Sequence, residues 1–138
     1  MKAKDYLNQL AIIEISIHQK LKELEAFDTQ IIGSIDYSKE KVQTSFTQEA
    51  IFTKMLEKKE FLEKKINAEI DNYIDQKHQI IQEIQNLKNK NQIQVLLKHY
   101  VEYKPFKVIA KEMQYSYSYV IRLHQCALKA FQKGYKKI

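Results

Sequence analysis

Residues that could catalyse a reaction or bind a metal ion are few in this sequence. The four histidines are scattered along the chain: His18, His78, His99 and His124. None of them lies at the spacing of a zinc site with the single cysteine, Cys126. Asp71, Asp75 and His78 would share one face of a helix, but a solvated polar face accounts for that spacing. No Walker loop, nucleophile elbow or dinucleotide-binding glycine motif is present. We therefore expect no enzyme, bound metal, cofactor or small-molecule substrate.

The positive charge of the chain is concentrated in its last third. Residues 88–138 hold 10 Lys and 1 Arg against 2 Glu, a net charge of +9, whereas residues 1–87 hold 12 Lys against 15 Asp and Glu, a net charge of −3. From Tyr115 to the end no acidic residue is present. Such a segment favours a polyanionic partner, either nucleic acid or an acidic protein surface.

The composition predicts an all-α protein. The 138 residues include 2 Gly, 1 Pro and no Trp, too few turn residues for a sandwich or barrel. No apolar run approaches the roughly 18 residues that cross a bilayer, and Glu14 interrupts the apolar part of the N-terminus, so we expect neither a membrane segment nor a signal peptide. One cysteine excludes an internal disulfide and fits a reducing cytoplasm.

Two long amphipathic helices are predicted in residues 1–88. The first spans about residues 3–32, with apolar side chains at alternating steps of three and four, and Gly33 marks its end. A loop is expected over Gly33–Ser45, and the second helix over about 46–88. They most simply fold back as an antiparallel, coiled-coil-like hairpin for packing and dimerisation. The seam consists of Leu7, Leu10, Ile17, Leu21, Leu24, Ile66, Ile70, Tyr73, Ile81 and Ile84. The second helix is longer than the first, which favours a homodimer, although an intramolecular hairpin would use the same residues.

Three shorter helices are predicted in residues 91–138. The first would bury Ile93, Leu96, Leu97, Tyr100 and Val101, and the second, opened by Pro105, would bury Phe106, Ile109, Ala110 and Met113. Ser116 would cap the third, whose apolar face is Val120, Leu123, Ala127 and Phe131 with Leu128 beside it. The alternating "YSYSYV" (115–120) would also suit a strand, but an isolated strand has no edge to pair with.

A short helix, a tight turn and a longer basic helix form the plan of a helix-turn-helix. With Val120 facing the core, the exposed side of a recognition helix over about 117–132 carries the candidate base-contacting residues, namely Tyr117, Ser118, Ile121, Arg122 and Gln125. Arg122 suits guanine, and Gln125 suits adenine. Phosphate contacts are expected from Lys104, Lys107, Lys111, Lys129 and Lys133, with Lys136 and Lys137 beyond them. We expect His124 to be partly buried and hydrogen-bonded, and Tyr115, Tyr117 and Tyr119 either to pack the turn or, for Tyr117, to contact DNA.

The segment "IQVLLKHYVEYKPFKVIAKEMQYSYSYVIRLHQCALKAF" resembles region 4 of bacterial sigma factors. Its "IAKEM", serine turn and "V..L...AL..F" spacing carry the resemblance, which covers about a third of the chain. With the "MKAKDYL" start and the "YSKEKVQTS" loop, the whole chain is similar to small phage and integrative-element proteins of Gram-positive bacteria, grouped near the ArpU/RinA-like late-gene transcription regulators. The resemblance implies promoter or operator binding, with RNA polymerase as a further candidate partner. The sigma-type promoter element does not carry over, because the exposed positions hold Tyr117, Ser118, Ile121 and Arg122.

Two functions from different classes follow. The first is a sequence-specific transcription regulator of a phage or mobile element that binds double-stranded DNA through residues 91–138. The alternative is an interaction or inhibitor module whose basic part grips an acidic host protein, such as a polymerase subunit or a nuclease, without specific DNA binding. A DNA-packaging or recombination accessory factor would also bind DNA.

Overall fold

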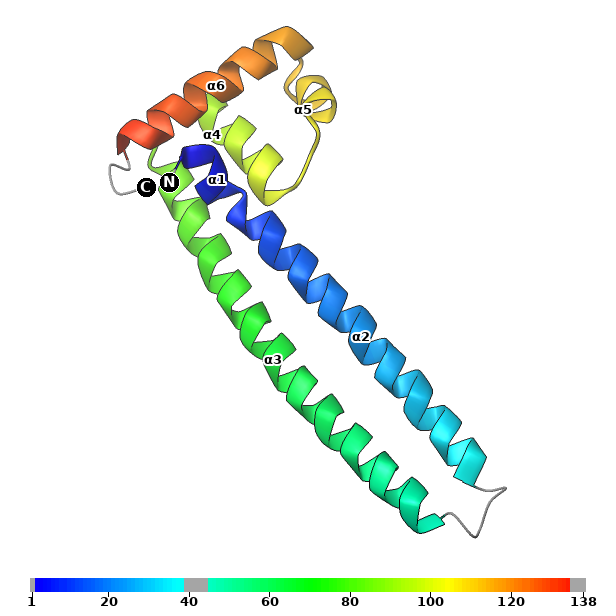
Figure 1. Cartoon of the computed structure of the whole chain (residues 1–138). Helices are drawn as coiled ribbons and strands as arrows, with labels where there is room; N and C mark the ends of the chain where they lie inside the picture. The colour runs from blue at the N-terminus through cyan, green and yellow to red at the C-terminus, as the bar shows by residue number, and fades with distance from the viewer. Residues whose placement is uncertain (1, 39–44, 135–138) are drawn as a thin grey trace. The chain divides into compact units, whose positions relative to one another are not determined.

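The structure, a computed structural model, describes the backbone of residues 2–38 and 45–134 and the side chains of residues 2–29 and 49–134. These residues form helices and the turns between them, without a strand in the described part, which confirms the all-α prediction. The order is α1 (Ala3–Leu7), α2 (Gln9–Ser38), α3 (Ser45–Gln85), α4 (Lys90–Leu96), the π-helical turn η2 (Leu97–Val101), α5 (Phe106–Met113) and α6 (Tyr117–Gly134) (Figure 1). None of the described helices combines the length and apolarity that a membrane crossing requires.

The boundaries of the first helix differ from the sequence prediction at both ends. A turn at Asn8 separates α1 from α2, whereas one helix was expected over 3–32. Gly33 lies within α2, which continues to Ser38, so the prediction that this glycine ends the helix is wrong. A glycine inside a helix costs only about 1 kcal/mol relative to alanine, so it does not by itself end a helix. Of the loop expected over Gly33–Ser45, residues 39–44 lie outside the described part.

The chain divides into two compact units. Unit 1 comprises Met1–Glu14 and Tyr73–Ile138, and unit 2 comprises Ile15–Asn72. The two ends of the chain therefore build one unit, and the segment between them builds the other. The limits of these compact units lie at residues 14/15 and 72/73 and not between residues 88 and 91. The division into two functional parts, residues 1–88 and 91–138, stays a prediction.

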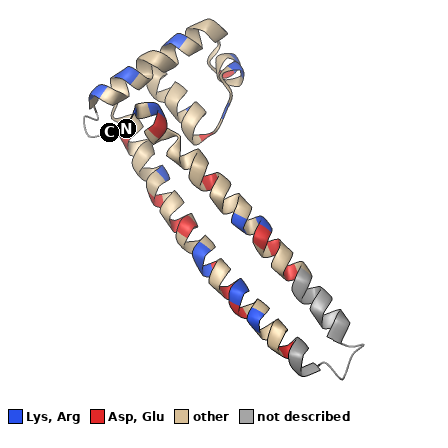
Figure 2. Cartoon of the chain, in the orientation of Figure 1, with Lys and Arg blue, Asp and Glu red and all other residues tan. Residues whose placement is uncertain are grey.

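In unit 2, α2 and α3 lie side by side and run antiparallel. Lys20 pairs with Glu69, and Asp28 pairs with Lys59. Residues of increasing number along α2 therefore lie opposite residues of decreasing number along α3. Acidic and basic residues alternate along both helices (Figure 2). Water screens ion pairs at this exposure, so they set the alignment of the helices more than their stability. The hydrogen bond and charge of Asp28 raise the pKa of Lys59.

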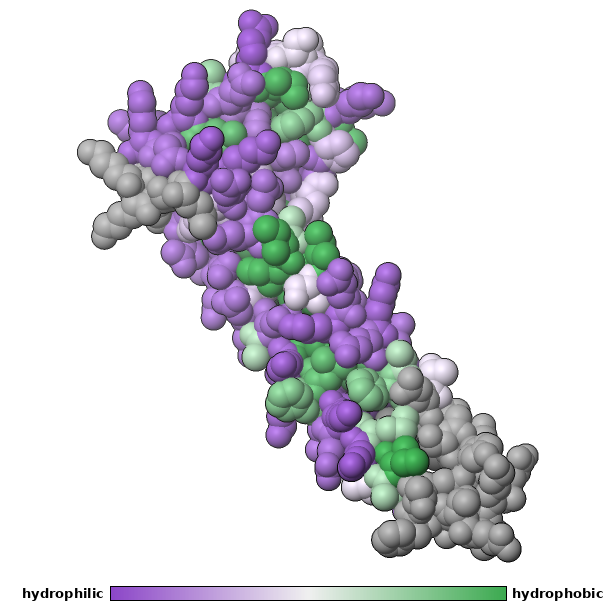
Figure 3. Space-filling view, viewed as in Figure 1, coloured by the Kyte–Doolittle hydropathy of each residue, from purple (hydrophilic) through white to green (hydrophobic). Residues whose placement is uncertain are grey.

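The apolar contact of unit 2 is narrow. Its buried side chains in the described part are Ile17, Leu62 and Ile66. Several large apolar side chains stay exposed, among them Ile15, Leu21, Ile51, Leu56 and Phe61. Hydrophobic side chains accordingly remain visible between hydrophilic ones along α2 and α3 (Figure 3). Of the predicted seam residues in this unit, Ile17 and Ile66 are buried, Leu24 and Ile70 are half-buried, and Leu21 is 37% exposed.

Unit 1 holds the main hydrophobic core. Its buried members come from every helix of the unit: Ala3, Leu7, Leu10, Ile80, Ile84, Val95, Leu96, Tyr100, Ile109, Ala110, Val120, Leu123, Ala127 and Phe131. The first helix is tied to the last, because the Tyr6 ring stacks on Phe131 at 6.0 Å and the backbone N–H of Ala3 donates to Gln132 Oε1 at 2.7 Å. Of the predicted seam residues in this unit, Leu7, Leu10 and Ile84 are buried, and Tyr73 and Ile81 are half-buried.

Candidate nucleic-acid interface

The turn between α5 and α6 is defined by specific backbone hydrogen bonds. Pro105 precedes α5 with φ −65° and ψ 155°, an extended conformation that suits a helix start. Gln114 ends α5 in the left-handed region (φ 60°, ψ 39°). Its N–H donates to Lys111 O at 3.3 Å, and the N–H of Tyr115 donates to Ala110 O at 3.0 Å. This is the Schellman pattern, which reverses the chain within a few residues and satisfies the last carbonyl groups of the helix.

Helix α6 begins directly after this turn. The Oγ of Ser116 accepts a hydrogen bond from the N–H of Tyr119 at 3.2 Å, which confirms the predicted cap. The buried face of the helix is Val120, Leu123, His124, Ala127 and Phe131, which confirms the predicted apolar face and adds the histidine. Because this face is fixed by the core of unit 1, the direction of every other side chain of α6 is fixed as well.

The residues predicted to contact bases lie away from that core. Ser118, Arg122 and Gln125 are exposed, Tyr117 is 50% exposed, and Ile121 is half-buried. All of them belong to the N-terminal half of α6. The helix contains no Asp or Glu (Figure 2), so Arg122 has no carboxylate on its own helix to pair with. The arrangement leaves one guanidinium and one carboxamide on the same exposed side of a helix.

The predicted phosphate-contacting lysines fall into two groups. Lys107, Lys111, Lys129 and Lys133 are exposed, and no carboxylate of the described residues lies within ion-pair distance of them. Together with Arg122 they make up what we call the basic surface. Lys104 differs, because its Nζ lies 2.7 Å from Glu112 Oε1 and 3.2 Å from Glu102 Oε1. Lys136 and Lys137 lie outside the described residues.

Both carboxylates of residues 88–138 are occupied by lysines. Glu112 pairs with Lys104 and, at 2.9 Å, with Lys98, while Glu102 pairs with Lys104. The hydrogen bonds from Lys104 and then Lys98 lower the pKa of Glu112, and the bond to Glu112 raises the pKa of Lys104. The negative charges of this segment are therefore gathered at one place. The basic surface keeps its charge uncompensated by any described carboxylate.

A cluster of aromatic rings holds α6 against η2 and α5. The hydroxyl of Tyr100 and Nε2 of His124 are hydrogen-bonded at 2.7 Å, and the ring of Phe106 lies 4.8 Å from that of His124. His99 stacks on Phe106 at 4.1 Å, and its Nδ1 lies 3.0 Å from Lys104 O. These contacts confirm the prediction of a partly buried, hydrogen-bonded His124.

Burial keeps the hydrogen-bonded pair of Tyr100 and His124 neutral. Desolvation lowers the pKa of His124 to about 4, and the charges of His99 and Lys4 add to that effect. Desolvation also raises the pKa of Tyr100 to about 12. At neutral pH the pair is therefore an uncharged hydrogen bond inside the core. Its function here is to position α6.

The sequence does not decide whether Tyr115, Tyr117 and Tyr119 pack inside the turn or are exposed. Tyr115 and Tyr119 are each 39% exposed, and their ring centroids lie 4.7 Å apart at an angle of 55°. Asn91 Nδ2 donates to the Tyr115 hydroxyl at 3.2 Å. Tyr117 is the most exposed of the three, so none of them fills the interior of the turn. In the sequence, the one feature that drew attention to these exposed rings is the alternation of tyrosine with serine over 115–119.

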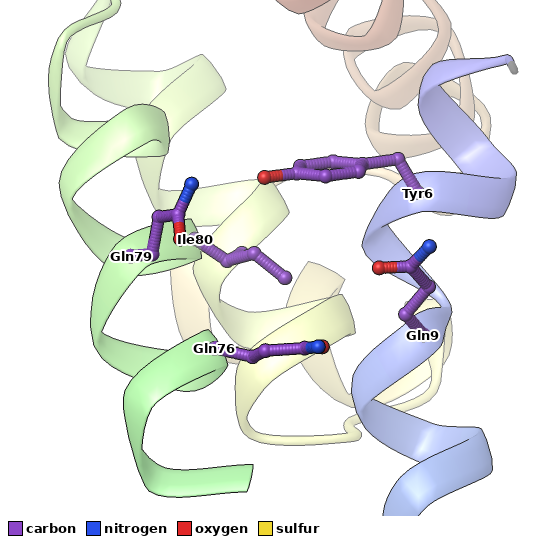
Figure 4. A pocket seen from close by; sticks show the side chains of 5 residues that line it. All are labelled: Tyr6, Gln9, Gln76, Gln79 and Ile80. Carbon is purple, nitrogen blue, oxygen red and sulfur yellow. The ribbon is translucent and has the colours of Figure 1, made fainter. Parts of the chain in front are cut away.

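Other kinds of site are sparse in the described residues. They contain no group of three or more His, Cys, Asp or Glu side chains placed to hold a metal ion. A cavity of about 130 Å³ in unit 1 is lined by Tyr6, Gln9, Gln76, Gln79 and Ile80 (Figure 4). Next to it the buried carboxylate of Glu83 accepts hydrogen bonds from the Tyr6 hydroxyl at 2.6 and 2.8 Å and from Gln79 Nε2 at 3.0 Å. No protein-family model, curated protein or solved structure matched this chain in comparison.

Proposed function

We propose that this chain is a sequence-specific DNA-binding transcription regulator of a phage or mobile element. In this proposal residues 91–138 are a helix-turn-helix similar to region 4 of sigma factors, and α6, over about 117–132, is the recognition helix in the major groove. The observation that supports it best is the exposed side of α6. Ser118, Arg122 and Gln125 lie there opposite a well-buried face, on a helix that carries no carboxylate.

The chemistry of these side chains suits base recognition. The planar guanidinium of Arg122 donates two parallel hydrogen bonds, which match O6 and N7 of guanine. The carboxamide of Gln125 both accepts and donates, which matches N6 and N7 of adenine. The apolar parts of Tyr117 and Ile121 suit the methyl group of thymine. A helix packed on one face and exposed on the other presents these groups together, as the major groove requires.

The lysines of the basic surface would orient the protein without reading sequence. Lys107 and Lys111 lie on α5, and Lys129 and Lys133 lie in the C-terminal half of α6. Lysine is a point charge that binds any phosphate, so these residues supply affinity and register. Lys104, held by Glu112 and Glu102, would contribute less than the others.

Unit 2 would supply the second half of the function. In the proposal α2 and α3 form a helical hairpin that joins two copies or contacts RNA polymerase. The exposed apolar side chains of these helices, such as Leu21 and Phe61, support an association surface. A dimer would read two half-sites, and their spacing would report its geometry.

The test is a selection from a random duplex library at physiological salt with excess competitor DNA. Wild-type protein should enrich one sequence motif. Arg122→Ala and Gln125→Ala should each lose about 5- to 150-fold of discrimination at one base position, the equivalent of about 1–3 kcal/mol. Arg122→Lys keeps the positive charge but loses the two parallel N–H donors of the guanidinium. It should therefore lose discrimination between bases while keeping most of the affinity for DNA. Lys58→Ala, exposed on α3, is the matched control.

A different outcome would reject the proposal. If all duplexes are retained equally and salt abolishes retention, the basic surface acts only electrostatically. An acidic protein partner would then be the function to test. In that case Arg122→Ala and Gln125→Ala would leave the behaviour toward DNA unchanged.

A further inference from the structure

Tyr115 and Tyr119, which we call the tyrosine pair, expose aromatic surface beside the basic surface. Each residue is 39% exposed and the two ring centroids lie 4.7 Å apart, so each ring covers part of the other and leaves the rest of its surface open. A tyrosine whose ring serves only core packing is largely covered, as Tyr100 is at 3% exposure. The pair therefore offers aromatic surface that a ligand can contact.

The pair is held in place by its neighbours. Asn91 Nδ2 donates to the hydroxyl of Tyr115 at 3.2 Å, which links the ring to the start of α4. The backbone of Tyr115 is fixed by its hydrogen bond to Ala110 O, and that of Tyr119 by its bond to Ser116 Oγ. Tyr115 is thus held at its backbone and its hydroxyl, and Tyr119 at its backbone and by its contact with the Tyr115 ring. Side chains held in this way lose less conformational freedom when a ligand binds.

The charge around the pair selects an anionic ligand. Lys111 on α5, Arg122 on α6 and Lys90 at the start of α4 are exposed on the three elements that meet at the pair. The nearest acidic residue in the sequence, Glu112, is occupied by Lys98 and Lys104. Positive side chains on all three elements therefore favour the approach of a polyanion to the open aromatic rings.

We propose that the tyrosine pair is a stacking platform for unpaired nucleobases, so that the chain also binds single-stranded nucleic acid. Paired bases in a duplex turn only their edges outward, and their faces are covered by neighbouring bases, so open tyrosine rings find no stacking partner there. Unpaired bases offer both faces, and stacking on aromatic rings along a basic surface is how single strands are bound without sequence preference. This inference shares the basic surface of the proposed function but uses residues outside its base-reading set.

The experiment measures binding of full-length protein to fluorescently labelled (dT)12 by anisotropy at physiological salt. The comparison ligands are the (dT)12·(dA)12 duplex, a 12-mer of abasic nucleotides with the same phosphates, and (rU)12. We expect (dT)12 to bind at least tenfold more tightly than the abasic strand and more tightly than the duplex. The ratio of (dT)12 to (rU)12 affinity then says whether the natural single strand is DNA or RNA.

Substitutions separate the aromatic ring from the hydroxyl. Tyr119→Ala and Tyr115→Ala should each weaken (dT)12 binding by about 5- to 150-fold, the range for one stacked base. Tyr119→Phe and Tyr115→Phe should stay within about twofold of wild type, because they keep the ring. Equal binding of the abasic strand, or Phe variants as weak as the Ala variants, would overturn the inference. The proposed function is tested separately by running the duplex selection on Tyr119→Ala. This variant should still enrich the same duplex motif as the wild type, even if it no longer binds single strands.

Discussion

Acidification from pH 7 to pH 5 should destabilise unit 1 through His124. The unfolded chain binds a proton at this ring with the ordinary pKa of about 6.5, whereas burial lowers the pKa in the folded protein to about 4. Above pH 6.5 the ring is neutral in both states and imposes no penalty. As the pH falls below 6.5, His124 becomes protonated in the unfolded chain but stays neutral in the folded protein. The free energy of unfolding therefore decreases until about pH 4. At pH 5 the loss amounts to about 2 kcal/mol.

The assay is urea unfolding followed by circular dichroism at pH 7, 6 and 5, with hydrogen exchange of α6 as a local readout. His124→Gln removes the titrating group, so its unfolding free energy should change less than that of the wild type over this range, by about 2 kcal/mol. His78→Gln is the matched control, because His78 is exposed on α3. The lowered pKa of Glu112 means that its stabilising contribution is lost only below its unfolded value of 4.5, outside this window.

His124 is not the source of the pH dependence if His124→Gln and wild type show the same dependence between pH 7 and pH 5. That result would mean that the ring of His124 is protonated in the folded protein near its ordinary pKa. If His78→Gln instead removes the dependence as completely as His124→Gln does, the effect is not specific to the buried ring, and the assignment to His124 is rejected.

Further substitutions test other parts of unit 1. Gln114→Gly should raise the melting temperature, with a gain of about 0.5–1 kcal/mol, since φ 60° is strained for any residue with a Cβ; Gln114→Val should lower it. Phe131→Ala should cost about 3–5 kcal/mol in urea unfolding, because its side chain is only 1% exposed in the core. Glu112→Gln should free Lys98 for phosphate, whereas Lys104 keeps its pair with Glu102, so the slope of log affinity against log salt for a non-specific duplex should steepen by about 1. An unchanged slope would show that Lys98 does not face DNA.

The features predicted from sequence are those that depend on neighbouring residues. Ser116 and Pro105 mark helix starts because a hydroxyl caps the next N–H groups and proline suits only the first turn. The buried face of α6 follows from apolar residues at steps of three and four. The environment of His124 followed from its place on that face.

The features that escaped prediction depend on distant contacts or on the backbone alone. The helix is interrupted at Asn8 although no proline or glycine lies there to predict a break. Gly33, which the sequence predicts as a helix end, lies inside α2. Gln114 adopts a left-handed conformation that the sequence would assign to glycine. Glu83 is only 5% exposed, and its carboxylate accepts hydrogen bonds from Tyr6, which is far away in sequence. No local pattern encodes such a partner.

The construction of unit 1 from both ends of the chain has a consequence during protein synthesis. Tyr6, Leu7 and Leu10 are synthesised well before Phe131, on which the Tyr6 ring stacks. About 125 residues separate the two rings, so at about 5–20 residues per second the N-terminal segment waits roughly 6 to 25 seconds for its partner. During that delay its apolar side chains have no finished core to enter. The packing of α1 is thus completed only when α6 has been synthesised, which makes this contact a late step in the folding of unit 1.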